Sequence, residues 1–122
     1  MIFDAGTGVQ RIADERARQI AKEGWTPEHD DNHTEGELAI VAALYATPIR
    51  LFAKERDDLR VVRFADPWPH SWDTEWDKRL EQRDPRLTTK SRLRELEKAG
   101  ALIAAEIDRL LRKIDTVGKD VP

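Results

Sequence analysis

The segment KSRLRELEKAGALIAAEIDRLLRKI, residues 90–114, decides the fold of this chain. Its apolar residues recur at alternating steps of three and four, the spacing that places side chains along one line of an α-helix. They are Leu93, Leu96, Gly100, Ile103, Ile107, Leu110 and Ile114. The pattern predicts a helix over 89–115, roughly 40 Å long at about 1.5 Å per residue. A helix longer than the core of its own domain often pairs with another chain, so we expect a homo-oligomer built through 89–115.

Gly100 interrupts this apolar line. A glycine inside a helix costs about 1 kcal/mol relative to alanine. Its neighbours include the small residues Ala99, Ala101, Ala104 and Ala105. Together these residues predict that another helix approaches closely at this point.

A second helix is predicted over 8–23. Thr7 and Gln10 have the spacing of a capping box at its start, and Gly24 suits a left-handed turn at its end. One face of this helix is apolar, carrying Val9, Ile12, Ala13, Ala17, Ile20 and Ala21.

A third helix is predicted over 35–46, where Thr34 and Glu37 form another capping box. From residue 38 to residue 46 this helix is apolar almost all round, which is typical of a helix buried on most sides. Pro48 then suits the first position of a short helix over 48–54, or marks a simple kink.

Periodicity fades over 55–86, a stretch rich in tryptophan and proline. Within it, residues 60–64 fit a short strand, and Ser71 suits the cap of a short helix that carries Trp72 and Trp76. The predicted fold is therefore mostly α. It is a small helical bundle in one domain, 1–122, with a long C-terminal helix and an irregular middle segment.

Composition restricts the classes of function. The chain has no cysteine, which excludes disulfides, zinc–thiolate sites and cysteine nucleophiles. Its net charge of −3 gives no general attraction to nucleic acid. No apolar run approaches the roughly 20 residues that a membrane span requires. We therefore expect a cytoplasmic protein with no membrane or nucleic-acid partner.

The loop over 24–33 is the densest candidate site, because it combines Trp25 with carboxylates and imidazoles. Trp25 either stacks on a ligand ring or folds back as a hydrophobic clasp on the preceding helix. The acids either address a ligand or form a turn that caps the next helix. The predicted ligand-binding residues are Trp25, Thr26, Glu28, His29, Asp30, Asp31, His33, Trp68, Trp72, Trp76 and Arg92. In this scheme the tryptophans stack on a base. Phosphate or ribose is bound by His29, His33 and Arg92, and the sugar hydroxyls donate hydrogen bonds to Asp30 and Asp31.

A magnesium site is the alternative use of the acids, because carboxylate oxygens suit Mg²⁺. Its ligands would be Asp30, Asp31, Glu37 and Glu106. No His-Glu-x-x-His motif, glycine-rich phosphate loop or nucleophile elbow is present. The first expectation is therefore a binding protein with no cofactor and no catalytic residue.

Several strings in the chain resemble a group of short uncharacterised proteins of phages and prophages. These strings are ERxRQ (15–19), EGWTPEHDDxH (23–33), GELA (36–39), the Trp68-Pro69 pair and KAGALIAAEI (98–107). The resemblance covers most of the chain and implies a phage origin, with no activity attached.

Two further resemblances bear on the ligand. A helix followed by Gly24-Trp25, then by Asp30-Asp31 and His33, is similar to the ryanodine-receptor repeat domain, which implies a nucleotide-derived ligand. GELA at 36–39 and the paired helices resemble the all-α nucleoside triphosphate pyrophosphohydrolases, which implies clustered acids holding magnesium. The stretch that corresponds to their acidic pair, 98–101, contains no carboxylate here.

Three hypotheses follow. The first is a phage-encoded binder of a nucleotide or nucleotide-derived signal, sequestering an immune messenger of the bacterial host. The second is a Mg²⁺-dependent nucleotide pyrophosphohydrolase of the all-α type. The third is a module that grips a host protein through its long helix.

Overall fold

The computed structural model describes residues 6–80 and 86–117. In chain order its elements are α1 (Gly6–Glu23), α2 (Pro27–Asp30), α3 (Glu37–Ala46), β1 (Ala53–Arg56), β2 (Val62–Ala65), the 3-10 helix η1 (Thr74–Trp76) and α4 (Thr89–Val117). The protein is mostly α-helical, and the described residues hold a single two-stranded sheet. The predicted fold class is therefore confirmed.

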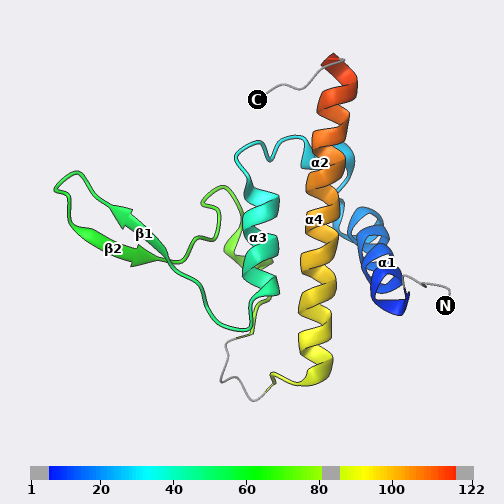
Figure 1. Cartoon of the computed structure of the whole chain (residues 1–122), viewed down its shortest axis with the longest axis horizontal. Coiled ribbons are helices and arrows are strands. Elements are labelled where there is room, and N and C mark those ends of the chain that lie inside the picture. The colour runs from blue at the N-terminus through cyan, green and yellow to red at the C-terminus, as the bar shows by residue number, and fades with distance from the viewer. Residues whose placement is uncertain (1–5, 81–85, 118–122) are drawn as a thin grey trace, which may run out of the picture.

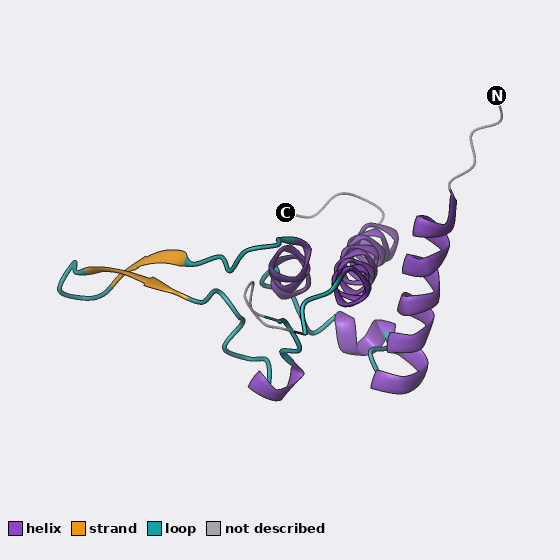
Figure 2. Ribbon diagram, turned by 90° about the horizontal axis from the view of Figure 1, so that it is seen from below, coloured by secondary structure: helices purple, strands orange, loops and turns teal. Residues whose placement is uncertain are grey.

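Helix α4 is the axis of the molecule. The chain runs up α4 and down α3, so the two pack antiparallel, while α1 lies on another side of α4 (Figure 1). Seen nearly along α4, the two helices flank it (Figure 2). With 29 residues against 10, α4 is about 43 Å long and α3 about 15 Å at 1.5 Å per residue. Much of α4 therefore extends beyond α3.

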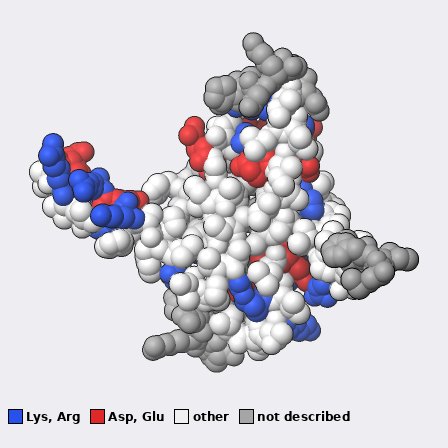
Figure 3. Space-filling view, viewed as in Figure 1, with Lys and Arg blue, Asp and Glu red and all other residues white. Residues whose placement is uncertain are grey.

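Strands β1 and β2 form an antiparallel hairpin, with Ala53 opposite Ala65 and Arg56 opposite Val62. The hairpin projects away from the helices (Figures 1 and 2) and carries charged side chains of both signs (Figure 3). The strand predicted over 60–64 corresponds to β2, shifted by one or two residues.

The short helix predicted over 48–54 is wrong. Thr47 ends α3 in an extended conformation, residues 48–52 are irregular and β1 begins at residue 53. Ile49 and Phe52 are more than half exposed, so a short helix here has no apolar surface to bury against and gains too little to form.

The helix predicted to start after Ser71 instead begins at Thr74, as the 3-10 helix η1. Asp73 caps η1 instead, its carboxylate accepting from the backbone N–H of Glu75 at 2.9 Å. Trp72 lies before this turn, in the core, because its side chain is 3% exposed.

The capping box predicted for α1 does not form. The helix begins at Gly6, so Thr7 lies inside it, and Gln10 Nε2 donates to Asp14 Oδ1 at 2.8 Å. Gly24 does follow the end of the helix with a φ of 71°, as predicted.

The capping box predicted for α3 is only partly realised. Gly36, not Thr34, is the N-cap residue, with a left-handed φ of 80° and no side-chain cap. The side chain of Glu37 still folds back onto the backbone, where its Oε1 accepts a hydrogen bond from the N–H of Glu35 at 2.6 Å. The glycine turn therefore replaces the threonine cap.

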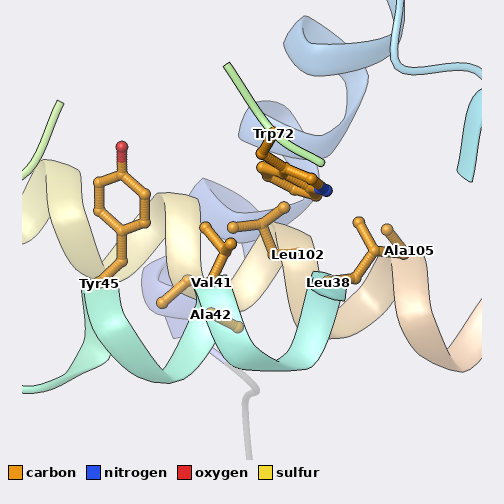
Figure 4. Packing of buried hydrophobic residues seen from close by; sticks show 8 residues of the cluster. Leu38, Val41, Ala42, Tyr45, Trp72, Leu102 and Ala105 are labelled. Atoms are coloured by element: carbon orange, nitrogen blue, oxygen red, sulfur yellow. The ribbon is translucent and has the colours of Figure 1, made fainter. Parts of the chain in front are cut away.

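The hydrophobic core lies where α3 meets α4, beneath Trp72 (Figure 4). Alanines on α4 let α3 approach closely, because they leave room for the larger side chains of α3. The buried cluster consists of Leu38, Val41, Ala42, Tyr45, Trp72, Ala99, Leu102 and Ala105.

Helix α1 buries a largely polar face. Its buried residues are Glu15, Arg16 and Gln19, whereas Val9 is 57% and Ile20 38% exposed. The apolar face noted in the sequence thus points largely to solvent. The polar face turns inward because its charged side chains pair with groups on α2 and α4.

Gly100 is a point of close contact between α4 and α1. A Cβ placed on Gly100 would lie 2.6 Å from Cδ1 and 2.7 Å from Cγ1 of Ile12. The close helix contact predicted from the sequence is confirmed, and Ile12 fills the space that Gly100 leaves open.

No helix in 6–80 or 86–117 has the length and apolar character needed to cross a bilayer.

The contact at Gly100 predicts that Gly100→Ala destabilises the parent chain but stabilises a variant that lacks the Ile12 side chain. In the parent chain, Gly100→Ala should lower the free energy of unfolding by up to about 2 kcal/mol. Overpacking destabilises a core by about 1–3 kcal/mol, whereas the higher helix propensity of alanine stabilises the helix by about 1 kcal/mol. In an Ile12→Ala background the clash is gone, so the same substitution should stabilise by about 1 kcal/mol. Urea unfolding of the four proteins measures both effects, and an equal effect in the two backgrounds would contradict this packing.

Candidate functional site

The loop between α1 and α3 folds back against the bundle. After Gly24, the backbone N–H of Trp25 donates to the carbonyl of Gln19 at 3.1 Å. Thr26 then caps α2, its hydroxyl accepting from the N–H of His29 at 3.3 Å, with Pro27 at the first helical position. Thr26, predicted as a ligand contact, therefore has a structural role.

A buried ion pair fixes this loop to α1. Arg16 Nη2 lies 2.5 Å from Oδ2 of Asp30, whose side chain is fully buried. Arg16 Nη1 also donates to the carbonyl of Trp25 at 3.3 Å. Asp30, predicted to accept from a sugar hydroxyl, is thus shut off from any ligand and sets the position of Trp25.

Asp31 ties the same loop to α4. Its carboxylate lies 2.7 Å from Arg112 Nη2, which also donates to the carbonyl of Pro27 at 3.3 Å. This pair is exposed, with half of the Asp31 side chain accessible. Glu28 is exposed at the surface of α2.

The two loop histidines pack against each other, with ring centroids 4.8 Å apart. Trp72 Nε1 donates to His33 Nδ1 at 3.3 Å. Burial lowers the pKa of His33 below its ordinary 6.5, and neighbouring His29 adds to the effect, while Glu37 and Asp30 oppose it. A neutral His33 is what the Trp72 hydrogen bond requires, because Nδ1 must offer a lone pair.

The four tryptophans converge, as the pocket hypothesis requires. Trp72 lies at the centre, with ring centroids 5.3 Å from Trp25, 5.9 Å from Trp68 and 5.5 Å from Trp76, all nearly edge to face. Trp25 and Trp76 are also neighbours, at 6.1 Å. Such pairs add about 0.5–1.5 kcal/mol each beyond burial.

These rings line a partly open cavity of about 300 Å³ between α1, α3, α4 and the tryptophan-rich segment. Gln19 and Lys98 add polar groups to its wall. The Oε1 atom of Gln19 and the Nε1 atom of Trp68 are buried and have no hydrogen-bond partner within the described part of the chain. A buried polar atom without a partner is costly, so these two atoms are available to a bound molecule.

Lys98 contributes a positive charge to the cavity wall. Its Nζ lies 5.6 Å from the Tyr45 ring centroid, and within residues 6–80 and 86–117 it has no carboxylate partner. Burial lowers its pKa and nearby Arg94 lowers it further, while the carboxylates of Glu15 and Glu23 oppose the shift. A partly desolvated ammonium without a direct ion pair favours an anionic ligand.

Arg18 and Glu15, also at the cavity wall, are already engaged. Glu15 lies 2.6 Å from Arg18 and 2.9 Å from Arg94. Burial alone would raise the pKa of Glu15, but the hydrogen bonds from the two guanidinium groups outweigh it and the pKa falls. Glu15 is therefore an ionised structural acid.

Sequence reasoning missed Gln19, Lys98 and Tyr45 as members of this wall. All three lie inside helices with strong apolar or charged patterns, so local sequence gives no sign that they face one cavity. Tyr45 is held by the N–H of Lys78, which donates to its hydroxyl at 2.9 Å, and burial raises its pKa to about 12.

Arg92 lies elsewhere. Its guanidinium donates to the carbonyls of Tyr45 and Ala46 at the end of α3. It borders a second cavity of about 350 Å³, separate from the tryptophans. Arg92 therefore satisfies helix-end carbonyls rather than a phosphate in the tryptophan cavity.

The four carboxylates of the magnesium alternative do not converge. Asp30 pairs with Arg16 and Asp31 with Arg112, whereas Glu106 Oε1 lies 2.6 Å from Arg109 Nε. Glu37 lies 3.4 Å from His33 and accepts from backbone. In the described ranges, no group of three or more His, Asp or Glu residues is arranged to hold a metal ion.

Comparison of the chain with protein-family models, curated proteins and solved structures gave no match. The function is therefore argued from geometry.

The two neighbouring acids of the loop should differ sharply in their contribution to stability. Asp30→Asn leaves Arg16 buried without a counter-ion and should cost about 3–5 kcal/mol. Asp31→Asn removes an exposed pair and should cost less than about 1 kcal/mol. Urea unfolding of both variants measures the difference, and similar costs would show that the Asp30 pair is not buried in solution.

His33 should make stability depend on pH. Its pKa is lower in the folded state, so the unfolded chain takes up a proton first as the pH falls, and stability is lost below about 6.5. His33→Gln should lose less stability than the parent between about pH 7.5 and pH 5.5, whereas exposed His70→Gln should follow the parent. Thermal unfolding at both pH values is the measurement, and a His33→Gln curve parallel to the parent's would contradict the assignment.

Proposed function

We propose that this chain binds a small molecule that combines a planar aromatic ring with an anionic group, the chemistry of a nucleotide. The observation that carries the proposal is the cavity of about 300 Å³ in which tryptophan rings meet Lys98. Its volume is at the lower end of the range for small-molecule sites, roughly 300–1,000 Å³. Its wall combines aromatic rings with charged and polar side chains, those of Glu15, Arg18, Gln19, Glu23, Glu75, Lys78 and Lys98.

Trp25 and Trp76 are the proposed stacking partners of the ring. Trp76 is 39% exposed and Trp25 is partly exposed, so both retain surface that a ligand can cover. Trp72 belongs to the core and supports the other rings from behind. Stacking on an aromatic side chain contributes about 1–3 kcal/mol per base.

Lys98 is the proposed partner of the anionic group, with the side chain of Lys78 at the cavity rim. An anion beside Lys98 would form the direct ion pair that Lys98 lacks within the described residues, in addition to the weaker field of Glu15 and Glu23. These residues take the role that the sequence analysis gave to His29, His33 and Arg92, whose side chains do not line this cavity.

Gln19 and Trp68 would select among ring systems. The free Oε1 of Gln19 accepts one hydrogen bond, as from an exocyclic amino group, and Trp68 Nε1 donates one. A ligand that satisfies both atoms removes two buried unpaired groups, which favours it over an analogue that lacks those atoms.

Binding without turnover is the proposed form of activity. Glu15, the buried acid at the cavity, is neutralised by Arg18 and Arg94. Together with the resemblance to phage proteins, this supports sequestration of a nucleotide-derived signal of the bacterial host.

The test is tryptophan fluorescence and thermal shift against a panel of linear and cyclic nucleotides, each beside its uncharged nucleoside. Lys98→Met should weaken a phosphorylated ligand at least about tenfold, because a charge-assisted hydrogen bond contributes about 1.5–3 kcal/mol. It should leave the nucleoside unaffected. Trp76→Ala should weaken both ligands, and Lys90→Met, an exposed lysine near the start of α4, should weaken neither.

The bound nucleotide should be recovered unchanged after incubation with Mg²⁺. Release of pyrophosphate would contradict sequestration and favour the hydrolase. No fluorescence or thermal response to any nucleotide, or equal affinity of the parent and Lys98→Met for the phosphorylated ligand, would overturn the assignment of the cavity.

A further inference from the structure

Helix α4 carries an apolar stripe that its own bundle leaves uncovered. The α4 stripe consists of Leu93, Leu96, Ile103, Ile107, Leu110 and Ile114, each between 40% and 52% exposed. The core residues of the same helix, such as Leu102 and Ala105, point toward α3 and are fully buried. The face that shows α3 and α4 is largely free of charged side chains along its middle (Figure 3).

Ile12 divides this stripe. It packs over Gly100, so α1 occupies the stripe at that point. Beyond it, Ile103, Ile107, Leu110 and Ile114 continue at steps of four, three and four along the C-terminal half of α4. This spacing is that of a two-helix coiled-coil seam. Leu111, beside the seam, is also 53% exposed.

We propose that this half of α4 pairs antiparallel with the same segment of a second copy of the chain. With the two-fold axis between residues 108 and 109, Ile107 meets Leu110 of the partner subunit and Ile103 meets Ile114 of the partner subunit. All four apolar layers are filled by large aliphatic side chains, which the monomer leaves half exposed.

Charge complementarity favours a second copy of the chain as the partner of this stripe, in the antiparallel register given above. Glu106 and Lys113 are the charged residues on the same flank of the seam. In the antiparallel pair each Glu106 lies beside Lys113 of the partner subunit, and on the other flank Ala104 lies beside Leu111 of the partner subunit. The Glu106 side chain is 13% exposed and is held at this edge by its ion pair with Arg109, so the partner's Lys113 would reach its remaining exposed surface.

Competing arrangements are less favourable. A parallel pair in register places Glu106 beside an apolar Leu111. Sliding the antiparallel pair by one heptad places Glu106 beside its own copy, which repels it. Sliding it by a second heptad requires Gly100 to face Ile103 of the partner subunit, but Ile12 already fills that space.

Disulfide cross-linking tests the register directly, because the chain has no cysteine of its own. In the proposed dimer Ile103→Cys protein alone should give no cross-linked dimer on oxidation, nor should Ile114→Cys alone. An equimolar mixture of the two should cross-link. Cross-linking of Ile103→Cys with itself would show a parallel pair and overturn the proposal.

Sedimentation and light scattering test the dimer without engineered bonds. The parent chain should be dimeric, Ile107→Glu should weaken the dimer at least about 100-fold, and Lys113→Glu about 5–10-fold. Lys113→Arg, which keeps the positive charge, should retain the parent affinity. Lys90→Glu, off the seam, is the control and should change nothing.

Circular dichroism confirms that each variant is folded, which is expected because Lys90, Ile103, Ile107, Lys113 and Ile114 are all exposed. A parent chain that is monomeric at every concentration would overturn the proposal. So would a Lys113→Glu protein that dimerises as strongly as the parent.

Discussion

Arg16 and Asp30 form an ion pair in the interior of the protein, 2.5 Å apart, and much of the remaining structure depends on it. The pair holds the loop after α1 against the bundle, and Arg16 also binds the carbonyl of Trp25. The Trp25 ring is thereby placed against Trp72, which closes the cavity on the side of α1. A helix that buries charge loses solvation, and only a well-placed partner offsets that loss.

Helix α4 contributes side chains to two opposite surfaces of the molecule. Lys98 faces the tryptophan cavity, whereas Ile103 and Ile107 lie on the stripe that α3 and α1 leave uncovered. The helical repeat separates these residues by about half a turn. A ligand in the cavity and a second copy on the stripe would therefore not compete for space, and pairing of α4 would hold two cavities in one assembly.

The long C-terminal helix, the close contact at Gly100 and the left-handed Gly24 are recognisable from sequence because each depends on local spacing or on a backbone that glycine tolerates. The short helix at 48–54 was not predictable in this way. Its residues have helical spacing, but there is no neighbouring surface for Ile49 and Phe52 to pack on. The uses of Asp30, Asp31 and Arg92 were also hidden, because their partners lie on distant elements.

The sequence by itself determined that the chain is mostly helical, that α4 carries an apolar line interrupted at Gly100, and that the tryptophans lie outside the long helices. These features follow from periodicity and composition, which act over a few residues. Only the tertiary structure decided that α1 turns its polar face inward, that the tryptophans enclose a cavity with Gln19 and Lys98, and that the apolar line of α4 stays exposed. The physical reason is that burial and charge pairing depend on which elements meet in space, and the pairing of Arg16 with Asp30 outweighs the apolar preference of α1.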